Sequence, residues 1–158
     1  MNELLTRSIS HHYKLESLPD IGSEASLDKA LSHFQGTRKL FQHQIEGINW
    51  AIESERVRGG GFLASDMGLG KTLQTLLLCC AYDKIGLNLV VVPVGLMYRP
   101  WQEEAQHQNN WGTRSPFKSF VYHGSSRKNT PPSSLSKNYN LVITSYETLK
   151  NSVELQNI

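Results

Sequence analysis

The sequence predicts an α/β fold in which a mostly parallel sheet of about four strands is flanked by helices. A short apolar run at residues 62–64 leads through a glycine-containing loop into an apolar stretch of helical length, residues 73–82. Three further apolar runs have the length of buried strands: residues 88–92, 120–124 and 141–144. Strands that alternate with helical stretches favour parallel pairing, with the helices on the faces of the sheet.

The composition fits one ordinary domain of 158 residues. A hydrophobic content of 39% permits a core and argues against global disorder, and a net charge of +2 is too small to indicate a nucleic-acid partner by itself. No apolar run reaches membrane-spanning length, and the first residues lack the pattern of a secretory signal. The two cysteines, Cys79 and Cys80, are adjacent on one predicted helix, so we expect buried free thiols in a reducing compartment.

The N-terminal part, residues 1–36, is predicted to be an extension with one helix. Residues 1–22 carry little signal, and His11 and His12 lack partners at metal-ligand spacing. Residues 23–36 have apolar side chains at helical spacing. Ser23 or Ser26 is the expected cap at the start of this helix and Gly36 its expected end. We expect the helix to pack on the main domain.

Residues 38–55 form a second amphipathic stretch, predicted to be a helix that precedes the first strand. Its apolar residues are expected to face the core. Gln44 in this stretch is a candidate for recognition of adenine, because a carboxamide offers both a donor and an acceptor, as the adenine edge does. A glutamine in a helix is not specific evidence by itself.

The loop that follows residues 62–64 is the strongest functional signal in the chain. Gly68 and Gly70 allow the backbone to turn with positive φ and to approach a ligand closely. Amides at the start of the next helix lack intrahelical partners and favour an anion, Lys71 supplies a positive charge, and the Thr72 hydroxyl suits Mg²⁺. The candidate binding residues of the loop are Asp66, Met67, Gly68, Leu69, Gly70, Lys71 and Thr72. The alternative is a glycine-rich turn before a buried helix, with Lys71 a solvated charge.

Two blocks together resemble the opening of a Swi/Snf-type ATPase, a helicase-like DNA translocase of superfamily two. They are residues 40–50, LFQHQIEGINW, and residues 60–74, GGFLASDMGLGKTLQ. The first is similar to the Q motif of that family and the second to its motif I. Ser65 stands where the family usually has an acidic residue.

Later blocks follow in the order that the family has. Pro93 and Leu96, then Trp101 and Glu104, are similar to motif Ia, and residues 122–124 are similar to its Y-H-G block. Residues 143–147, ITSYE, resemble the block that contacts the backbone of the tracked DNA strand in that family. This resemblance implies that Thr144 and Ser145 contact DNA. We expect Trp101 to be a packing residue and His123 to be structural, because His123 has no acidic partner at a recognisable spacing.

The resemblance implies that residues 37–158 are an incomplete RecA-like ATP-binding lobe, since no Asp-Glu block follows Tyr146. The implied cofactors are ATP and Mg²⁺, and the implied partners of a full-length parent are double-stranded DNA and chromatin, in the nucleus and without a membrane. We expect this chain to bind ATP without hydrolysing it, because phosphoryl transfer needs a positioned metal and water. One alternative is a non-catalytic remnant that binds a protein partner, and another is an unrelated P-loop kinase.

Overall fold

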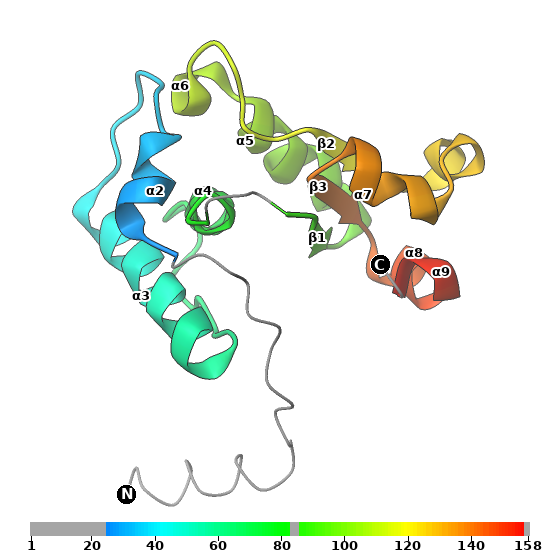
Figure 1. The fold of residues 1–158 in the computed structure, drawn as a ribbon, viewed down its shortest axis with the longest axis horizontal. Helices are drawn as coiled ribbons and strands as arrows, with labels where there is room; N and C mark the ends of the chain where they lie inside the picture. Colours follow the sequence, from blue (N-terminus) through cyan, green and yellow to red (C-terminus); the bar gives the residue numbers. More distant parts are fainter. Residues whose placement is uncertain (1–24, 83–85, 157–158) are drawn as a thin grey trace, which may run out of the picture.

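The computed structural model describes residues 25–82 and 86–156, so the predictions for His11, His12 and Ser23 lie outside the described part. Its strands are β1 (Asn88–Val91), β2 (Ser119–Val121) and β3 (Leu141–Thr144). Its α-helices are α2 (Leu27–Ser32), α3 (Gln42–Arg58), α4 (Lys71–Cys79), α5 (Glu103–Gln106), α6 (Gln108–Trp111), α7 (Leu135–Asn138), α8 (Tyr146–Lys150) and α9 (Val153–Gln156). Short 3₁₀ and π turns lie at 94–96, 97–102, 124–129 and 132–134. Figure 1 shows α2, α3 and α4 grouped on one side of the molecule and α7, α8 and α9 on the other.

The sheet has three strands in the order β1-β3-β2, and both pairings are parallel. Val90 and Val121 both lie opposite Ile143 in the central strand. The predicted strand at 141–144 has the same bounds in the structure, while the other two predictions shift by one to three residues. Pro93 follows β1, as expected for a residue that cannot donate to a ladder.

The predicted strand at residues 62–64 is wrong. This segment forms no strand, and Phe62 is 93% exposed. A strand is held by ladder hydrogen bonds to a neighbour. The three described strands pair only with one another, in the order β1-β3-β2, so an apolar composition alone does not make this segment part of the sheet.

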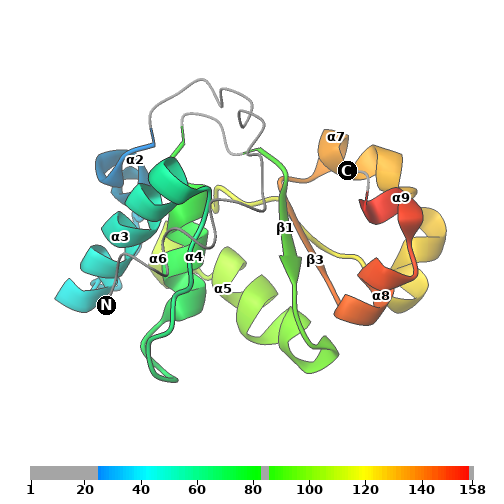
Figure 2. The same cartoon turned by 90° about the horizontal axis from the view of Figure 1, so that it is seen from below.

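The sheet separates two apolar clusters. In the central strand Leu141 and Ile143 face the larger cluster, with Ile48 of α3 and Leu76 of α4, while Val142 faces the smaller one. This alternation follows from the two-residue period of a strand. Figure 2 shows the same arrangement, with α3, α4 and α5 on one side of β1 and β3 and with α7, α8 and α9 on the other. The loop before α4 therefore stands on the side of the larger cluster.

The helices around the candidate loop have bounds that differ from the prediction. α3 runs from Gln42 to Arg58 and ends at Gly59, whose φ of 71° is the left-handed conformation that closes many helices. α4 begins at Lys71, two residues before the expected start, and Cys80 is its C-cap. The early start places Lys71 and Thr72 in the first turn of the helix. Among the described helices, none is both long and apolar enough to cross a bilayer.

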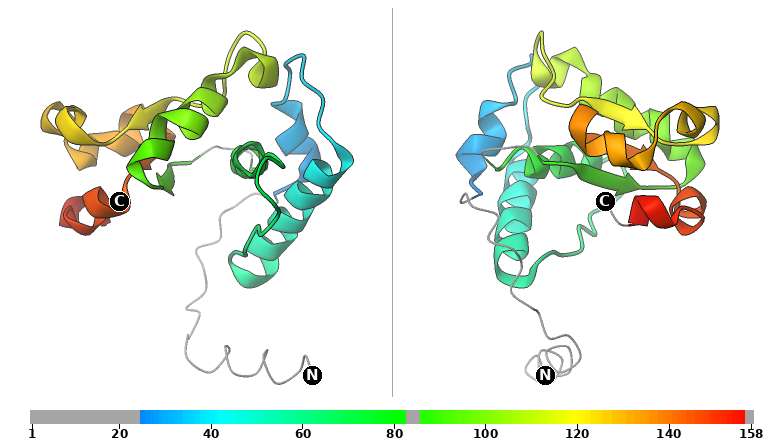
Figure 3. Two further views of the ribbon diagram at one scale, coloured as in Figure 1. Left: turned by 180° about the vertical axis from the view of Figure 1, so that it is seen from behind. Right: turned by 45° about the vertical axis from the view of Figure 1, so that its right-hand side comes forward.

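α2 is shorter than the predicted helix and packs into the main core. Ser26 is its N-cap and accepts a hydrogen bond from the Lys29 amide at 3.2 Å, as one of the two expected caps. Ala30 is fully buried in the larger cluster. Gly36 does not end the helix, since its amide instead donates to the Asn110 carbonyl at 3.0 Å. Figure 3 shows α2 beside α3 from two further directions.

The segment after β1 is irregular before it becomes helical. It contains a 3₁₀ turn at 94–96 and a π turn at 97–102, and the peptide bond between Arg99 and Pro100 is cis. Trp101 is partly buried against the larger cluster, as the sequence favoured. Residues 124–138 contain two 3₁₀ turns and the short helix α7. Phe120 stacks on Tyr139 with ring centroids 4.6 Å apart and thereby joins this region to the sheet.

We expect the two thiols to react slowly in the folded protein. Burial raises the pKa of Cys79 to about 12 and also raises the pKa of Cys80, because a thiolate loses its hydration there. At about pH 8 the thiolate fraction of Cys79 should be lower by about a thousandfold than that of an ordinary cysteine, and it should rise with pH. Iodoacetamide labelling with and without urea tests this prediction. Equal labelling rates in the two conditions would contradict it.

Candidate nucleotide-binding site

The loop from Ser65 to Gly70 turns back on itself before α4. Gly68 and Gly70 have φ values of 84° and 77°, which are the left-handed conformations that the sequence predicted for them. Gly70 is the N-cap of α4, so the loop delivers the chain directly into the first turn of that helix. The amides of this turn have no carbonyl one turn earlier to which they could donate. They therefore form the partly positive N-terminus of the helix, which attracts anions.

Lys71 crosses the loop. Its Nζ donates to the carbonyl oxygen of Ser65 at 2.6 Å and to that of Asp66 at 2.7 Å. The ammonium group is therefore held by the loop beside the left-handed glycines rather than directed into solvent. The Ser65 hydroxyl is buried and has no hydrogen-bond partner within the described residues. Asp66, Met67 and Leu69 are exposed, Met67 by 94%.

The residues present fit a phosphate group with a magnesium ion. A positive charge, left-handed glycines and a helix N-terminus are arranged on one loop, and this set matches the chemistry of a polyphosphate. Thr72 is in the first turn of α4 and half-buried, so its hydroxyl is the candidate protein ligand for Mg²⁺. The described residues contain no cluster of three or more histidine, cysteine or acidic side chains that would hold a metal alone.

Gln44 lies against this loop and is 8% exposed. Its Oε1 accepts from the Phe41 amide at 3.0 Å, and its Nε2 donates to the Leu69 carbonyl at 3.4 Å. The structure therefore brings Gln44 and the loop from Ser65 to Gly70 together. Both ends of the carboxamide are engaged within the chain, so recognition of adenine by Gln44 stays a prediction.

Thr144 and Ser145, the predicted DNA contacts, lie at the carboxyl end of β3 and are almost completely buried. The Thr144 hydroxyl donates to the Tyr122 carbonyl at 2.9 Å, and the Ser145 hydroxyl donates to Oγ1 of Thr148 at 2.9 Å while accepting from the Thr148 amide at 3.2 Å. His123 Nδ1 is 3.1 Å from the same Thr148 oxygen. In this conformation the hydroxyls join the segment that follows β2 to the segment that follows β3. The contact of His123 with Thr148 fits the structural role that the sequence predicted for His123.

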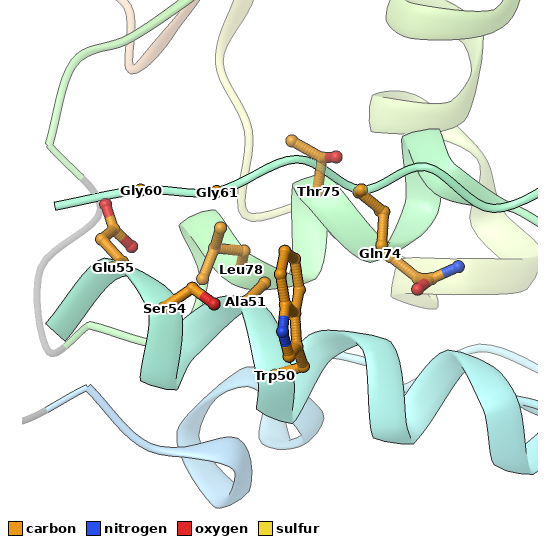
Figure 4. Close-up of a pocket in the computed structure, with 10 residues that line it drawn as sticks. Trp50, Ala51, Ser54, Glu55, Gly60, Gly61, Gln74, Thr75 and Leu78 are labelled. Carbon is orange, nitrogen blue, oxygen red and sulfur yellow. The ribbon is translucent and has the colours of Figure 1, made fainter. Parts of the chain in front are cut away.

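A cavity of about 250 Å³ lies behind the loop, between α3 and α4. Figure 4 shows Trp50, Ser54 and Glu55 of α3 on one wall and Thr75 and Leu78 of α4 on the other, with Gly60 and Gly61 passing across. Glu55 has one carboxylate oxygen that is buried without a hydrogen-bond partner among the described residues. Lys71, Gly68 and Gly70 do not line this cavity.

A family model described as "SNF2-related domain" matches residues 43–157, which is most of the chain. This chain belongs to the SNF2-related family. The match covers α3, the glycine loop, all three strands and the segment from 93 to 156. The predicted membership in a Swi/Snf-type ATPase family is therefore confirmed.

Curated relatives agree with this SNF2-related assignment. The chain is 35% identical over 135 residues to "ATP-dependent helicase ULS1" of Saccharomyces cerevisiae, with 82% of this chain and 8% of the relative covered. It is 30% identical over 120 residues to human "Chromodomain-helicase-DNA-binding protein 8", with 73% and 4% covered. It is 36% identical over 99 residues to "DNA repair protein RAD5" of Yarrowia lipolytica, with 61% and 9% covered. The chain thus spans less than a tenth of the length of these three relatives.

Solved structures confirm the fold. The "SWI2/SNF2 ATPase core in complex with dsDNA" of Sulfolobus solfataricus matches with a TM-score of 0.64 and 25% identity, over 80% of this chain and 25% of that chain. The "SWI2/SNF2 ATPase core domain" of the same organism matches with a TM-score of 0.62 over 82% of this chain. The SNF2-related chain therefore has a partial RecA-like fold, as predicted, with a parallel sheet and flanking helices.

Gln74 is the residue at this SNF2-related site to which the sequence interpretation gave no role. Its Nε2 donates to the Leu69 carbonyl at 3.0 Å, and the side chain is 3% exposed. The available signal was a single carboxamide within the apolar run of α4, four residues after Gly70. Side chains of a helix lean toward its N-terminus, so a residue at that spacing reaches back to the loop.

Proposed function

We propose that this chain binds ATP with Mg²⁺ at the loop formed by residues 65–72. The observation that carries the proposal is the position of Lys71, whose ammonium is held across the loop by the carbonyls of Ser65 and Asp66 at the N-terminus of α4. At this position the Lys71 ammonium would pair with the phosphates of a nucleotide, and the amides at the N-terminus of α4 would donate to the phosphate oxygens. The names of the curated relatives, which include an ATP-dependent helicase, support the same ligand.

Each residue of the site has a separate role in this proposal. Gly68 and Gly70 shape the loop, Lys71 pairs with the β- and γ-phosphates, and Thr72 holds the Mg²⁺ that the nucleotide brings. Gln44 recognises the adenine edge from α3. Asp66, Met67 and Leu69 form the exposed surface of the loop around the phosphates.

We expect binding without turnover in this chain. Hydrolysis needs carboxylates that hold the metal and orient water. Glu103 and Glu104 are the single adjacent acidic pair in the sequence, and both carboxylates are engaged in ion pairs. Glu103 pairs with Arg99 at 2.7 Å, and Glu104 pairs with Arg38 at 2.6 Å.

Double-stranded DNA, chromatin and a nuclear location are proposals for the whole protein. They rest on relatives whose names refer to DNA repair and to a chromodomain helicase, and on the solved SWI2/SNF2 core, which is in complex with dsDNA. Thr144 and Ser145 are the proposed contacts with the DNA backbone. For their side chains to meet a phosphate, the hydroxyls would have to leave Tyr122 and Thr148.

Titration with a fluorescent ATP analogue in the presence of Mg²⁺ tests the proposal, together with a phosphate-release assay with and without duplex DNA. We expect saturable binding that ATP displaces better than GTP does, with no release of phosphate above background. Equal displacement by both nucleotides would contradict the role of Gln44. DNA-stimulated phosphate release would contradict the expected absence of turnover.

A further inference from the structure

The Leu69 carbonyl, one residue before the N-cap of α4, is held by two glutamines from different helices. Gln74 of α4 donates to it at 3.0 Å, and Gln44 of α3 donates to it at 3.4 Å. Both side chains are buried, at 3% and 8% exposure. Gln44 is itself fixed, because its oxygen accepts from the Phe41 amide. Buried carboxamides that share one acceptor specify its position closely.

Two glycines make room for these carboxamides. A Cβ at Gly47 in α3 would overlap Oε1 of Gln74, and a Cβ at Gly70 would overlap Nε2 of Gln44. Gly47 lies in the middle of a helix, where glycine is less favourable than alanine by about 1 kcal/mol. Glycine at position 47 therefore leaves the space that the Gln74 carboxamide occupies. Gln74 also lines the cavity between α3 and α4, and in Figure 4 its carboxamide points away from Trp50.

The position of this carbonyl determines the direction of an amide that faces the ligand. The Leu69–Gly70 peptide is trans, since Arg99–Pro100 is the cis bond in the described part of the chain. In a planar trans peptide the C=O and N–H bonds point in opposite directions. With the Leu69 carbonyl turned toward Gln44 and Gln74, the Gly70 N–H is turned away from both glutamines.

We propose that Gln74 is a positioning residue for phosphate binding, which it supports by holding the Leu69 carbonyl so that the Gly70 amide faces the phosphates. The inference rests on the proposed binding of ATP at this loop. Gln44 assists from the other side, with the weaker of the two contacts. Gln74 does not touch the nucleotide in this account and acts through the backbone of the loop.

The test compares Gln74→Met, Gly47→Ala and the double variant with the intact chain in titrations with Mg·ATP. Gln74→Met keeps the length of the side chain and removes the donor. Gly47→Ala leaves Gln74 in place but displaces its carboxamide. Each single variant should weaken ATP binding by about three- to tenfold, as expected for the loss of one hydrogen bond. The double variant should be no weaker than Gln74→Met, because the two changes remove the same contact. Gln42→Met, at an exposed position of α3, is the matched control and should bind like the intact chain.

Two further measurements separate positioning from a general loss of structure. Gly47→Ala should keep an unfolding midpoint in urea close to that of the intact chain, because the gain in helix propensity of about 1 kcal/mol offsets the loss of the Gln74 hydrogen bond, while ATP affinity falls. The ¹⁵N–¹H signal of Gly70 should shift when Mg·ATP binds to the intact chain and should shift less in Gln74→Met. Unchanged affinity in both single variants would overturn the inference if Lys71→Ala still loses binding. Equal binding by the intact chain and Lys71→Ala would overturn the proposed function, and the inference with it.

Discussion

Replacement of Lys71 by alanine should reduce the affinity of the chain for Mg·ATP by at least tenfold. The Lys71 ammonium is bonded to two loop carbonyls at 2.6 and 2.7 Å, beside the amides that the phosphates would meet. A hydrogen bond to a charged group contributes about 1.5–3 kcal/mol, which corresponds to a factor of about 10 to 150 in the dissociation constant. Isothermal titration of both proteins with Mg·ATP measures the difference.

The control for this variant is Lys128→Ala. Lys128 is exposed on the 3₁₀ turn at 124–129, so its removal changes the net charge by the same amount without changing the loop before α4. Lys128→Ala should bind Mg·ATP as the intact chain does. Similar losses in both variants would mean that net charge, and not the site, governs binding. Full affinity in Lys71→Ala would remove the basis of the proposed function.

Replacement of Trp111 by alanine should destabilise the fold by about 3–5 kcal/mol, the usual range for loss of a buried aromatic side chain. Trp111 is 2% exposed. It packs edge-on against Phe34 and Phe117, with ring centroids 6.2 and 5.3 Å away. Its indole N–H donates to the Glu104 carbonyl at 2.8 Å. The variant therefore loses packing to two segments and a buried hydrogen bond at the same time.

Urea unfolding followed by circular dichroism measures this loss. Trp50→Ala is the control, because Trp50 is 41% exposed, and we expect its cost to be clearly smaller. If Trp111→Ala does not fold, Trp111→Phe keeps the measurement possible, since it retains an aromatic ring while it removes the indole N–H and part of the buried ring surface. That variant should lose about 1–2 kcal/mol. Equal midpoints for the Trp111 and Trp50 variants would show that Trp111 is not central to the core.

The pattern of apolar residues was sufficient to predict helices and strands that are themselves strongly apolar. The central strand, Leu141–Thr144, was predicted with its observed bounds because it is a short run of apolar and β-branched residues, and all four residues are buried in the structure. The prediction of a strand at 62–64 was wrong because a strand needs a neighbouring strand to pair with, and a local sequence pattern does not show whether one is present. The observed helix ends differ from the predicted ones where a capping glycine sets the end. Gly59 is the C-cap of α3, and Gly70 is the N-cap of α4.

The site was predictable to the extent that its chemistry is contiguous in the sequence. The loop glycines, Lys71 and Thr72 lie within five consecutive residues, and Gly68 and Gly70 have the positive φ values that were expected. Gln74 was not predicted, because its role depends on a contact with the Leu69 carbonyl and on the space left by Gly47 in another helix. The burial of Thr144 and Ser145 was also not visible in the sequence. Residue type suggested hydroxyls free for phosphate, whereas packing assigns them to Tyr122 and Thr148.

The docking of α2 has a practical consequence for anyone who excises this domain. The match to the family model begins at residue 43, yet α2, which precedes it, packs into the larger apolar cluster. The Ser26 amide donates to the Ala81 carbonyl at 3.0 Å, and Arg38 donates through its own amide to the Asn109 carbonyl at 2.9 Å. A protein trimmed to residues 43–157 would expose the surface that Ala30 covers and would lose the backbone hydrogen bonds from residues 36 and 38 to α6. A protease site or an affinity tag is therefore better placed before residue 25 than at the family boundary.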